Sequence, residues 1–430
     1  MAEETAGMVC PHCGSVLDEI QRQKMIPTVM DGALHKGDTL DTAKGIVAAG
    51  PTGSIRGYAW HVLAAPNVSL AGLAKDMEGA IEHRERTGRS DKIKQVMVRR
   101  FGEVFEGASD LKGLDARALK DRTRELENDG GGAVAISYRM GEIPAGVRFL
   151  TLAIDVGGGK FDILVRGWDG ERRSWLIDRR TIRQRQHADG VWRDLAPSKS
   201  QEDWTVLEHE LDRLYPLQDD PGHALPIAVM TVDASDGNVT WRAYEFARRM
   251  DRKRWATWRR VRCIKGATSP KAEPLPPSPT KISRDSEGKP VDPVVTLHLL
   301  GVHRLKEEAV SDLAIDDHGP GHCYFAGNTP DRTYDELFNE VQIDGKWVRN
   351  GPQETLDLYG YTEAARLMLQ PDRAGIKWDD PTARPIWARP VPLFSEGGDP
   401  AASGQGNPGV APVKAKSIMQ RFGDLNRAPR

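Results

Sequence analysis

The chain has 430 residues, of which 28% are charged, and its formal net charge at pH 7 is −2. This length predicts two or more domains with sizeable cores, and no apolar run is long enough to span a membrane. The near-neutral net charge excludes nucleic-acid binding through overall charge, so such binding would need a local basic patch. Four cysteines are too few for a disulfide framework and indicate a reducing, intracellular setting.

The first 148 residues divide into two segments. Residues 1–14 contain the motif CPHCG, in which Cys10 and Cys13 form one half of a zinc knuckle. A tetrahedral structural site needs four ligands and the sequence holds no second CxxC pair, so we expect an orphan half-site without stable zinc in the monomer. Residues 15–148 predict a mostly helical linker region, because apolar residues recur there at helical spacing. The expected helices cover 70–81, with Ser69 as N-cap, 91–107 and 114–127.

The pattern changes to strands at residue 149. The segment 149–168, FLTLAIDVGGGKFDILVRGW, places Asp155 towards the end of an apolar strand, and the glycines after it allow a tight turn into a second strand. Residues 149–157, 161–168 and 174–182 predict a three-stranded meander. A carboxylate at such a strand end is well placed to bind a hard cation, although many strand-end aspartates only cap turns.

A second strand, in the segment IAVMTVDASDGN, ends at Asp233, and Asn238 is expected to cap the helix that follows. That helix leads into a basic run, 248–265, which also contains two tryptophans. The run fits two interpretations equally well: a solvated helix end followed by an edge strand, or a surface that contacts the phosphate backbone of DNA. In the second interpretation the DNA contacts come from Arg259, Arg260, Arg262 and Lys265.

The last third of the chain predicts one inserted loop and two further helices. Residues 268–293 are rich in Pro, Ser and Lys and read as a loop between strands. A short helix is expected to start near Lys306, and a longer one covers 353–369. On the longer helix Asp357 shares its face with small residues such as Gly360, which would let the helix approach a sheet closely with the carboxylate inward. The alternative is a solvated aspartate near a helix N-terminus.

Asp155, Asp233 and Asp357 thus have compatible positions, two at strand ends and one on a late helix. Clustered carboxylates are costly unless a cation neutralises them, and two divalent cations can stabilise the attacking and leaving oxygens of a phosphodiester. The order of meander, helix, strand and late acidic helix predicts an α/β fold with an RNase H-like mixed sheet flanked by helices. This domain is expected over 149–370, after the helical linker region.

These motifs resemble the nuclease half of the large terminase subunit of tailed phages, the lambda-like GpA family. The matching pieces include FLTLAIDVGGGKFDILVRGW, AVMTVDASDGNVTWRAYEFAR, LLGVHRLKEEAVSDL and QETLDLYGYTEAA, within about residues 8–370. The resemblance implies a metal-dependent endonuclease that cuts double-stranded DNA during genome packaging in the host cytoplasm. By this likeness Asp155, Asp233 and Asp357 bind one or two Mg²⁺ or Mn²⁺ ions, Lys306 contacts DNA, and Glu354 has a supporting role.

The same resemblance implies three protein partners: the small terminase subunit, the capsid portal and the ATPase motor half of the terminase. No membrane partner is expected. We also expect no ATP site in this chain, whose nearest phosphate-loop candidate is GGGK at 157–160. That segment has Ile154 where the first glycine of the loop should be, and Phe161 where Ser or Thr must bind magnesium.

The C-terminal residues 371–430 are rich in Pro, Gly and Ala and predict a flexible tail. Near its end, Ile418, Met419, Phe422 and Leu425 fall in one helical stripe among basic residues. Since family members dock on the portal through this end of the subunit, the stripe is expected to fold against a groove on that partner. A tail without a binding role is the alternative.

Two other functions fit parts of the sequence. Asp-Val-Gly-Gly-Gly-Lys before a strand also resembles the first phosphate loop of actin-like ATPases and sugar kinases, which share the underlying fold. Those proteins need a second phosphate loop and a glycine-rich adenosine site, and neither can be placed here. A non-catalytic DNA-binding assembly module, with structural aspartates, is the other alternative. Metal-dependent cleavage separates that module from the enzyme.

Overall fold

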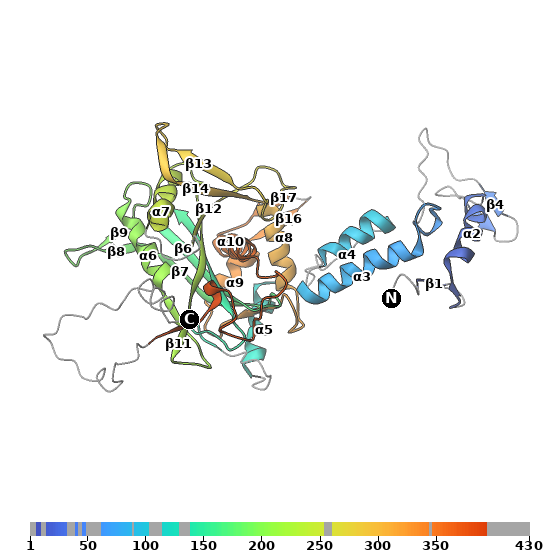
Figure 1. Ribbon diagram of the computed structural model, residues 1–430, viewed down its shortest axis with the longest axis horizontal. Coiled ribbons are helices and arrows are strands. Elements are labelled where there is room, and N and C mark those ends of the chain that lie inside the picture. Colours follow the sequence, from blue (N-terminus) through green and yellow to red (C-terminus); the bar gives the residue numbers. More distant parts are fainter. Residues whose placement is uncertain are drawn as a thin grey trace, which may run out of the picture. The chain divides into compact units, whose positions relative to one another are not determined.

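The computed structural model describes residues 6–9, 14–31, 39–41, 45–48, 62–87, 90–102, 114–128, 138–252, 260–343 and 346–393. The chain divides into two compact units, Met1–Asp110 and Leu111–Arg430 (Figure 1). The predicted domain start at residue 149 lies within the second unit. The second unit begins earlier because Leu119 is fully buried in its core. The hydroxyl of Tyr138 also lies within hydrogen-bond distance of the backbone carbonyl oxygens of Leu176 and Tyr324, in two strands of this unit, and donates its one hydrogen to them.

The first unit combines helices with two short hairpins. Ser69 caps α3 as predicted, because its Oγ accepts a hydrogen bond from the N–H of Gly72 at 3.1 Å. The helix predicted over 91–107 is shorter, and it ends at Phe101, before Gly102 with a left-handed φ of 70°. The CPHCG cysteines lie outside the described residues. The elements are β1 (Met8–Val9), β2 (Val16–Leu17), α2 (Glu19–Asp31), β3 (Thr39–Asp41), β4 (Gly45–Ala48), η1 (Val62–Ala64), α3 (Leu70–Thr87), α4 (Asp91–Val96) and η2 (Met97–Phe101).

A mixed β-sheet forms the centre of the second unit (Figure 1). The predicted meander is present as the antiparallel strands β5, β6 and β7, and β11 lies parallel to β5. Beyond β11, β12 and β14 continue in parallel, and β13 pairs with β14 inside the segment predicted as a loop. In sheet order the strands are β13 (Thr280–Arg284), β14 (Pro290–Leu300), β12 (Val261–Gly266), β11 (His223–Asp233), β5 (Phe149–Gly157), β6 (Lys160–Trp168), β7 (Ser174–Ile182) and β15 (Cys323–Phe325).

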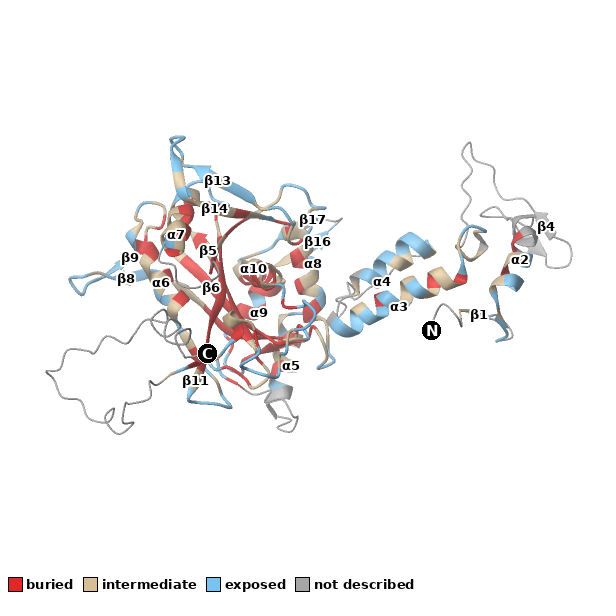
Figure 2. Cartoon of the chain, in the orientation of Figure 1, coloured by how far each residue is buried: buried red, intermediate tan, exposed pale blue. Residues whose placement is uncertain are grey.

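Helices cover both faces of this sheet, and the buried residues gather between the sheet and the helices on each face (Figure 2). One face packs against α6 (Thr205–Asp212) and α7 (Thr240–Arg252). The other face packs against α5 (Ala116–Asn128), α8 (Val302–Leu313), α9 (Asp331–Phe338) and α10 (Glu354–Leu369). A mixed sheet flanked by helices confirms the predicted fold class and is compatible with an RNase H-like fold.

Two details at helix N-termini differ from prediction: where α8 begins and which residue caps α7. Helix α8 begins at Val302, four residues before Lys306. Asn238 does not cap α7, because its side-chain amide donates to Asp236 Oδ1 at 3.0 Å. The backbone carbonyl of Asp236 instead accepts the N–H of Thr240, the first residue of the helix. The remaining elements are β8 (Gln184–Gln186), β9 (Trp192–Asp194), η3 (Glu202–Trp204), β10 (Leu214–Pro216), β16 (Glu340–Ile343), β17 (Lys346–Arg349), η4 (Ile386–Ala388) and β18 (Val391–Pro392).

The first part of the predicted tail, residues 371–393, belongs to the core of the second unit. Strand β18 pairs antiparallel with β11. Trp378 stacks on Phe149 with ring centroids 5.4 Å apart, and Trp387 meets the same ring edge-on at 5.2 Å. Its Pro and Gly content suggested disorder, but the two tryptophans bury against the first strand of the meander and hold the segment there. Residues 394–430, including the predicted docking stripe, lie outside the described residues.

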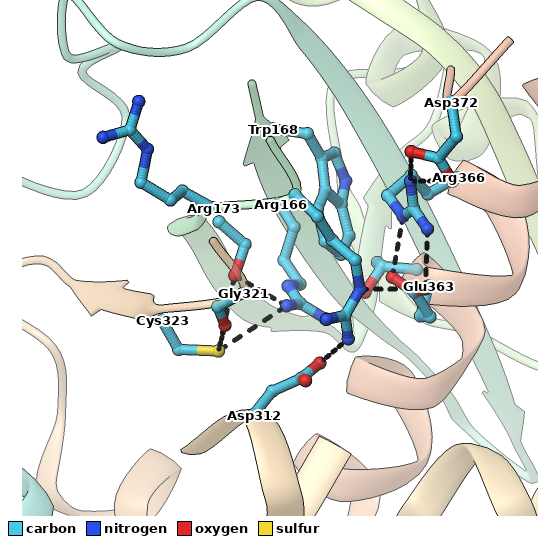
Figure 3. A network of polar contacts seen from close by, with 12 residues as sticks. Arg166, Trp168, Arg173, Asp312, Gly321, Cys323, Glu363, Arg366 and Asp372 are labelled. Atoms are coloured by element: carbon cyan, nitrogen blue, oxygen red, sulfur yellow. Dashed lines mark hydrogen bonds and ion pairs between the residues drawn. The ribbon is translucent and has the colours of Figure 1, made fainter. Parts of the chain in front are cut away.

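A buried ionic network joins α8, α10 and the chain after α10 (Figure 3). Arg172 forms ion pairs with Asp312 of α8 and with Glu363 of α10, and its side chain is 1% exposed. Arg366 pairs with the same Glu363 at 3.0 Å and with Asp372 at 3.0 Å. Because an unpaired charge at these depths would be strongly destabilising, the network fixes how α10 lies on the sheet.

Candidate active site

Two neighbouring parallel strands bring Asp155 and Asp233 together. In the register of β5 and β11, Ile154 is the partner of Val232. Each aspartate is the next residue along its strand, so the two carboxylates leave adjacent strands at the same level of the sheet. The two predicted strand-end aspartates are therefore neighbours.

Both aspartates lie on the sheet face that α10 covers. Thr151 and Thr231 donate hydrogen bonds from their Oγ1 atoms to backbone carbonyl oxygens of α10, at 3.2 and 3.4 Å. Side chains alternate between the two faces of a strand, so Asp155 and Asp233, four and two residues further on, share this face. The α10 helix can therefore bring a third carboxylate to the same place.

Asp357 is that third carboxylate, in the first turn of α10. Its Oδ2 accepts a hydrogen bond from Gln353 Nε2 at 2.8 Å, and its Oδ1 lies 2.8 Å from Lys306 Nζ. Lys306 also forms an ion pair with Glu340, and its side chain is only 8% exposed. The small Gly360 on the same helix does permit a close approach, but to α8, because a Cβ there would lie 3.2 Å from that of Leu305.

Burial is the largest cause that raises the pKa of each of the three aspartates. For Asp155, repulsion from Asp233 and Asp357 adds to burial, and the pKa rises from 3.8 to about 7. Two hydrogen bonds partly stabilise the charged form of Asp233, because the backbone N–H and the Oγ of Ser235 both donate to its Oδ1. The three groups thus form one electrostatically coupled cluster.

Asp162 is a further acid of this cluster and is not among the residues predicted from the sequence. It is the backbone partner of Asp155 across β5 and β6, and it is 1% exposed. Lys160 Nζ lies 2.7 Å from its Oδ2 and Arg179 Nη1 lies 3.1 Å from its Oδ1. The predicted supporting residue Glu354 also lies here, 3.3 Å from Lys160 Nζ. The available signal was a single acid within the apolar run of KFDILV, where a buried charge needs a partner.

A family model described as terminase large subunit gpA, endonuclease domain, matches residues 55–378. The chain belongs to this family. The match covers most of the chain, including all four aspartates described above, and it supports a nuclease role in DNA packaging. No curated protein and no solved structure matches the chain.

The basic run of this gpA-family chain is only partly at the surface. Arg260 is 5% exposed, and its Nη2 donates to two backbone carbonyl oxygens at 2.6 and 3.0 Å. The guanidinium of Arg260 is thus enclosed by the core, and its predicted contact with DNA stays a prediction. Lys306, also predicted to contact DNA, has its ammonium group between Asp357 and Glu340. Arg262 is partly exposed and Lys265 is exposed, whereas Arg259 lies outside the described residues.

The chemistry of the acidic cluster suits a hard divalent cation. Asp155 and Asp233 offer neighbouring, largely buried oxygen ligands whose repulsion a cation would relieve. Within the described ranges, no three His, Cys, Asp or Glu side chains are arranged as a ready-made metal site. Among the described helices, none is both long and apolar enough to cross a membrane.

Proposed function

We propose that this gpA-family chain is a divalent-metal-dependent endonuclease that hydrolyses double-stranded phage DNA during genome packaging. The observation that carries the proposal is the pairing of Asp155 and Asp233 on adjacent strands, beneath Asp357. The raised pKa of Asp155, about 7, reflects the burial and repulsion that a bound cation would offset.

Each side chain of the cluster has a definite role in this proposal. Asp155, Asp233 and Asp357 would hold Mg²⁺ or Mn²⁺, which supplies Lewis-acid stabilisation of phosphate charge and an activated water when bound. The Tyr361 hydroxyl donates to Asp233 Oδ2 at 3.3 Å and, with Ser235, fixes the direction of that carboxylate. Lys306 holds Asp357 in place from α8.

The DNA and protein partners follow from the family. The double-stranded substrate would contact Arg262 and Lys265 of the basic run, and Arg259, which lies outside the described residues, is the third proposed phosphate contact. The small terminase subunit, the ATPase motor half and the capsid portal are the proposed protein partners, in the host cytoplasm. ATP hydrolysis is assigned to the motor half, since GGGK at 157–160 forms the tight turn between β5 and β6.

The deciding experiment is incubation of the full chain with plasmid DNA and Mg²⁺ or Mn²⁺, with a chelator as control. Cleavage that requires the cation and is lost in Asp155→Asn and Asp233→Asn would support the proposal. DNA binding without cleavage under any of these cations would instead favour the non-catalytic assembly module. Tight ATP binding by the isolated chain, lost in Lys160→Ala, would favour the actin-like alternative.

A further inference from the structure

The turn GGGK at 157–160 places a lysine side chain within the acidic cluster. Gly157 and Lys160 are backbone partners at the end of the β5–β6 hairpin. A Cβ built on Gly157 would lie 2.9 Å from Lys160 Cγ and 3.1 Å from its Cε. Only glycine therefore leaves room for the lysine stem to lie back along β5, towards the carboxylates.

The ammonium group of Lys160 lies between two carboxylates that flank Asp155. Its Nζ is 2.7 Å from Asp162 Oδ2 and 3.3 Å from Glu354 Oε1. Both of these carboxylates repel Asp155, after the larger effects of burial, Asp233 and Asp357. Lys160 thus neutralises one side of the cluster from within the chain.

Lys306 does the same on the other side of the cluster. It forms ion pairs with Asp357, at 2.8 Å, and with Glu340. Both lysine side chains are largely shielded from solvent, with 26% of Lys160 and 8% of Lys306 exposed. Each ammonium group therefore bridges two carboxylates, as a metal ion would, but with a single positive charge.

Asp155 and Asp233 are left without such a partner. In the part of the chain that the structure describes, neither carboxylate has a basic side chain within 4 Å. The side-chain groups that contact Asp233 are the hydroxyls of Ser235 and Tyr361. By contrast, Asp162 and Glu354 share Lys160, and Glu340 and Asp357 share Lys306.

We infer that the site takes one divalent cation, bound by Asp155 and Asp233 with Asp357 as the third carboxylate, and that Lys160 and Lys306 supply the positive charge a second cation would provide. Lys160 is then a positioning residue of the site. This inference rests on the proposed nuclease function and departs from a two-cation arrangement. In this inference the GGGK segment serves to place Lys160 beside Asp162 and Glu354, and not to bind a nucleotide phosphate.

Titration of the full chain with Mn²⁺ tests the inference, with free Mn²⁺ measured from its electron paramagnetic resonance signal. We expect one Mn²⁺ per wild-type chain, and none in Asp155→Asn. Removing the ammonium group in Lys160→Met should open a second Mn²⁺ site, because Asp162 and Glu354 lose the positive charge that lies between them, while Arg179 stays on the other oxygen of Asp162. Lys160→Arg should restore a single ion, and Lys289→Met, at an exposed lysine, should match wild type.

Two results would overturn the inference: two Mn²⁺ ions of similar affinity in the wild type, or an unchanged single ion in a folded Lys160→Met. If Lys160→Met does not fold, Lys306→Met is the second variant. A folded Lys306→Met that binds the same number of Mn²⁺ ions as wild type would also overturn the inference. Failure of the proposed function looks different, because no cation would then support cleavage and Asp155→Asn would bind as much Mn²⁺ as wild type. Cation-dependent cleavage with two bound ions would reject the single-cation inference alone.

Discussion

Asp155 and Asp162 are backbone partners across β5 and β6, yet their carboxyl groups have opposite environments. Burial acts to raise the pKa of both, but Lys160 and Arg179 hold that of Asp162 below its usual range. Asp155 has no such partner among the described residues, and burial with repulsion from Asp233 raises its pKa to about 7. Neighbouring acids whose pKa values are driven apart have different roles, so we expect Asp155 to serve the reaction and Asp162 to support the structure.

The first prediction separates these two roles. Asp155→Asn should lower cleavage by at least about a hundredfold. It should also raise the free energy of unfolding at pH 8 by on the order of 2 kcal/mol, because a buried repelling charge is removed. Asp162→Asn should lower that free energy instead, since Arg179, with a side chain 1% exposed, loses one of its carboxylates. Melting temperatures and plasmid cleavage measure both effects. Equal stability changes in the two variants would contradict the assignment.

The second prediction concerns stability and pH without metal. The folded-state pKa of Asp155 is about 7 and its unfolded value is near 3.8, so between these values the folded state binds more protons. Stability should therefore fall as pH rises from about 4 to 7. In the presence of a chelator, the melting temperature should decline less over this range in Asp155→Asn than in wild type. Parallel curves for the two proteins would argue against a raised pKa.

The third prediction concerns His322, whose effect on the pH dependence of stability has the opposite sign to that of Asp155. His322 is fully buried, and burial lowers its pKa to about 4. Between pH 4 and 6.5 the unfolded state binds more protons at this residue, so its contribution to stability is lost as pH falls through that window. His322→Gln, which cannot be protonated, should flatten the loss of melting temperature between pH 6.5 and 4. His209→Gln, at an exposed histidine of α6, is the matched control.

The fourth prediction divides the basic run. Arg260→Ala should cost about 2–4 kcal/mol of stability, because two backbone carbonyl oxygens of the core lose their donor. Neutralising Arg262 and Lys265 should leave stability nearly unchanged and reduce the salt dependence of DNA binding by about one unit of slope per lost phosphate contact. Urea unfolding and DNA titrations at several salt concentrations measure the two effects. An unchanged slope would return these residues to the solvated-surface interpretation.

The fifth prediction concerns the C-terminal region. Removal of residues 400–430 should leave cleavage and melting temperature nearly unchanged and abolish binding to the capsid portal. Removal of residues 371–430 should unfold the second unit, since it takes away β18 and the two tryptophans that pack on Phe149. Retained stability in the longer truncation would contradict the packing role of 371–393. Retained portal binding in the shorter one would reject the docking stripe.

The sequence by itself determined the elements of the site. Alternating apolar residues and tight-turn glycines predicted β5, β6 and β7 nearly to the residue, and the run ending at Asp233 predicted β11. The helix carrying Asp357 followed from its 3.6-residue period. These features are local, because strand and helix periodicity is set by neighbours in the chain.

Only the tertiary structure decided which charges meet. Arg260 and Lys306 look like surface cations in the sequence, but core packing encloses both. Residues 371–393 have the composition of a tail, yet they pack on the first strand, more than 200 residues away in sequence. The link between Lys160, Asp162 and Glu354 depends on strand register and on how α10 lies over the sheet. Long-range packing sets both, and no local pattern encodes it, so six acids and two lysines that are scattered in the sequence form one site only in the folded chain.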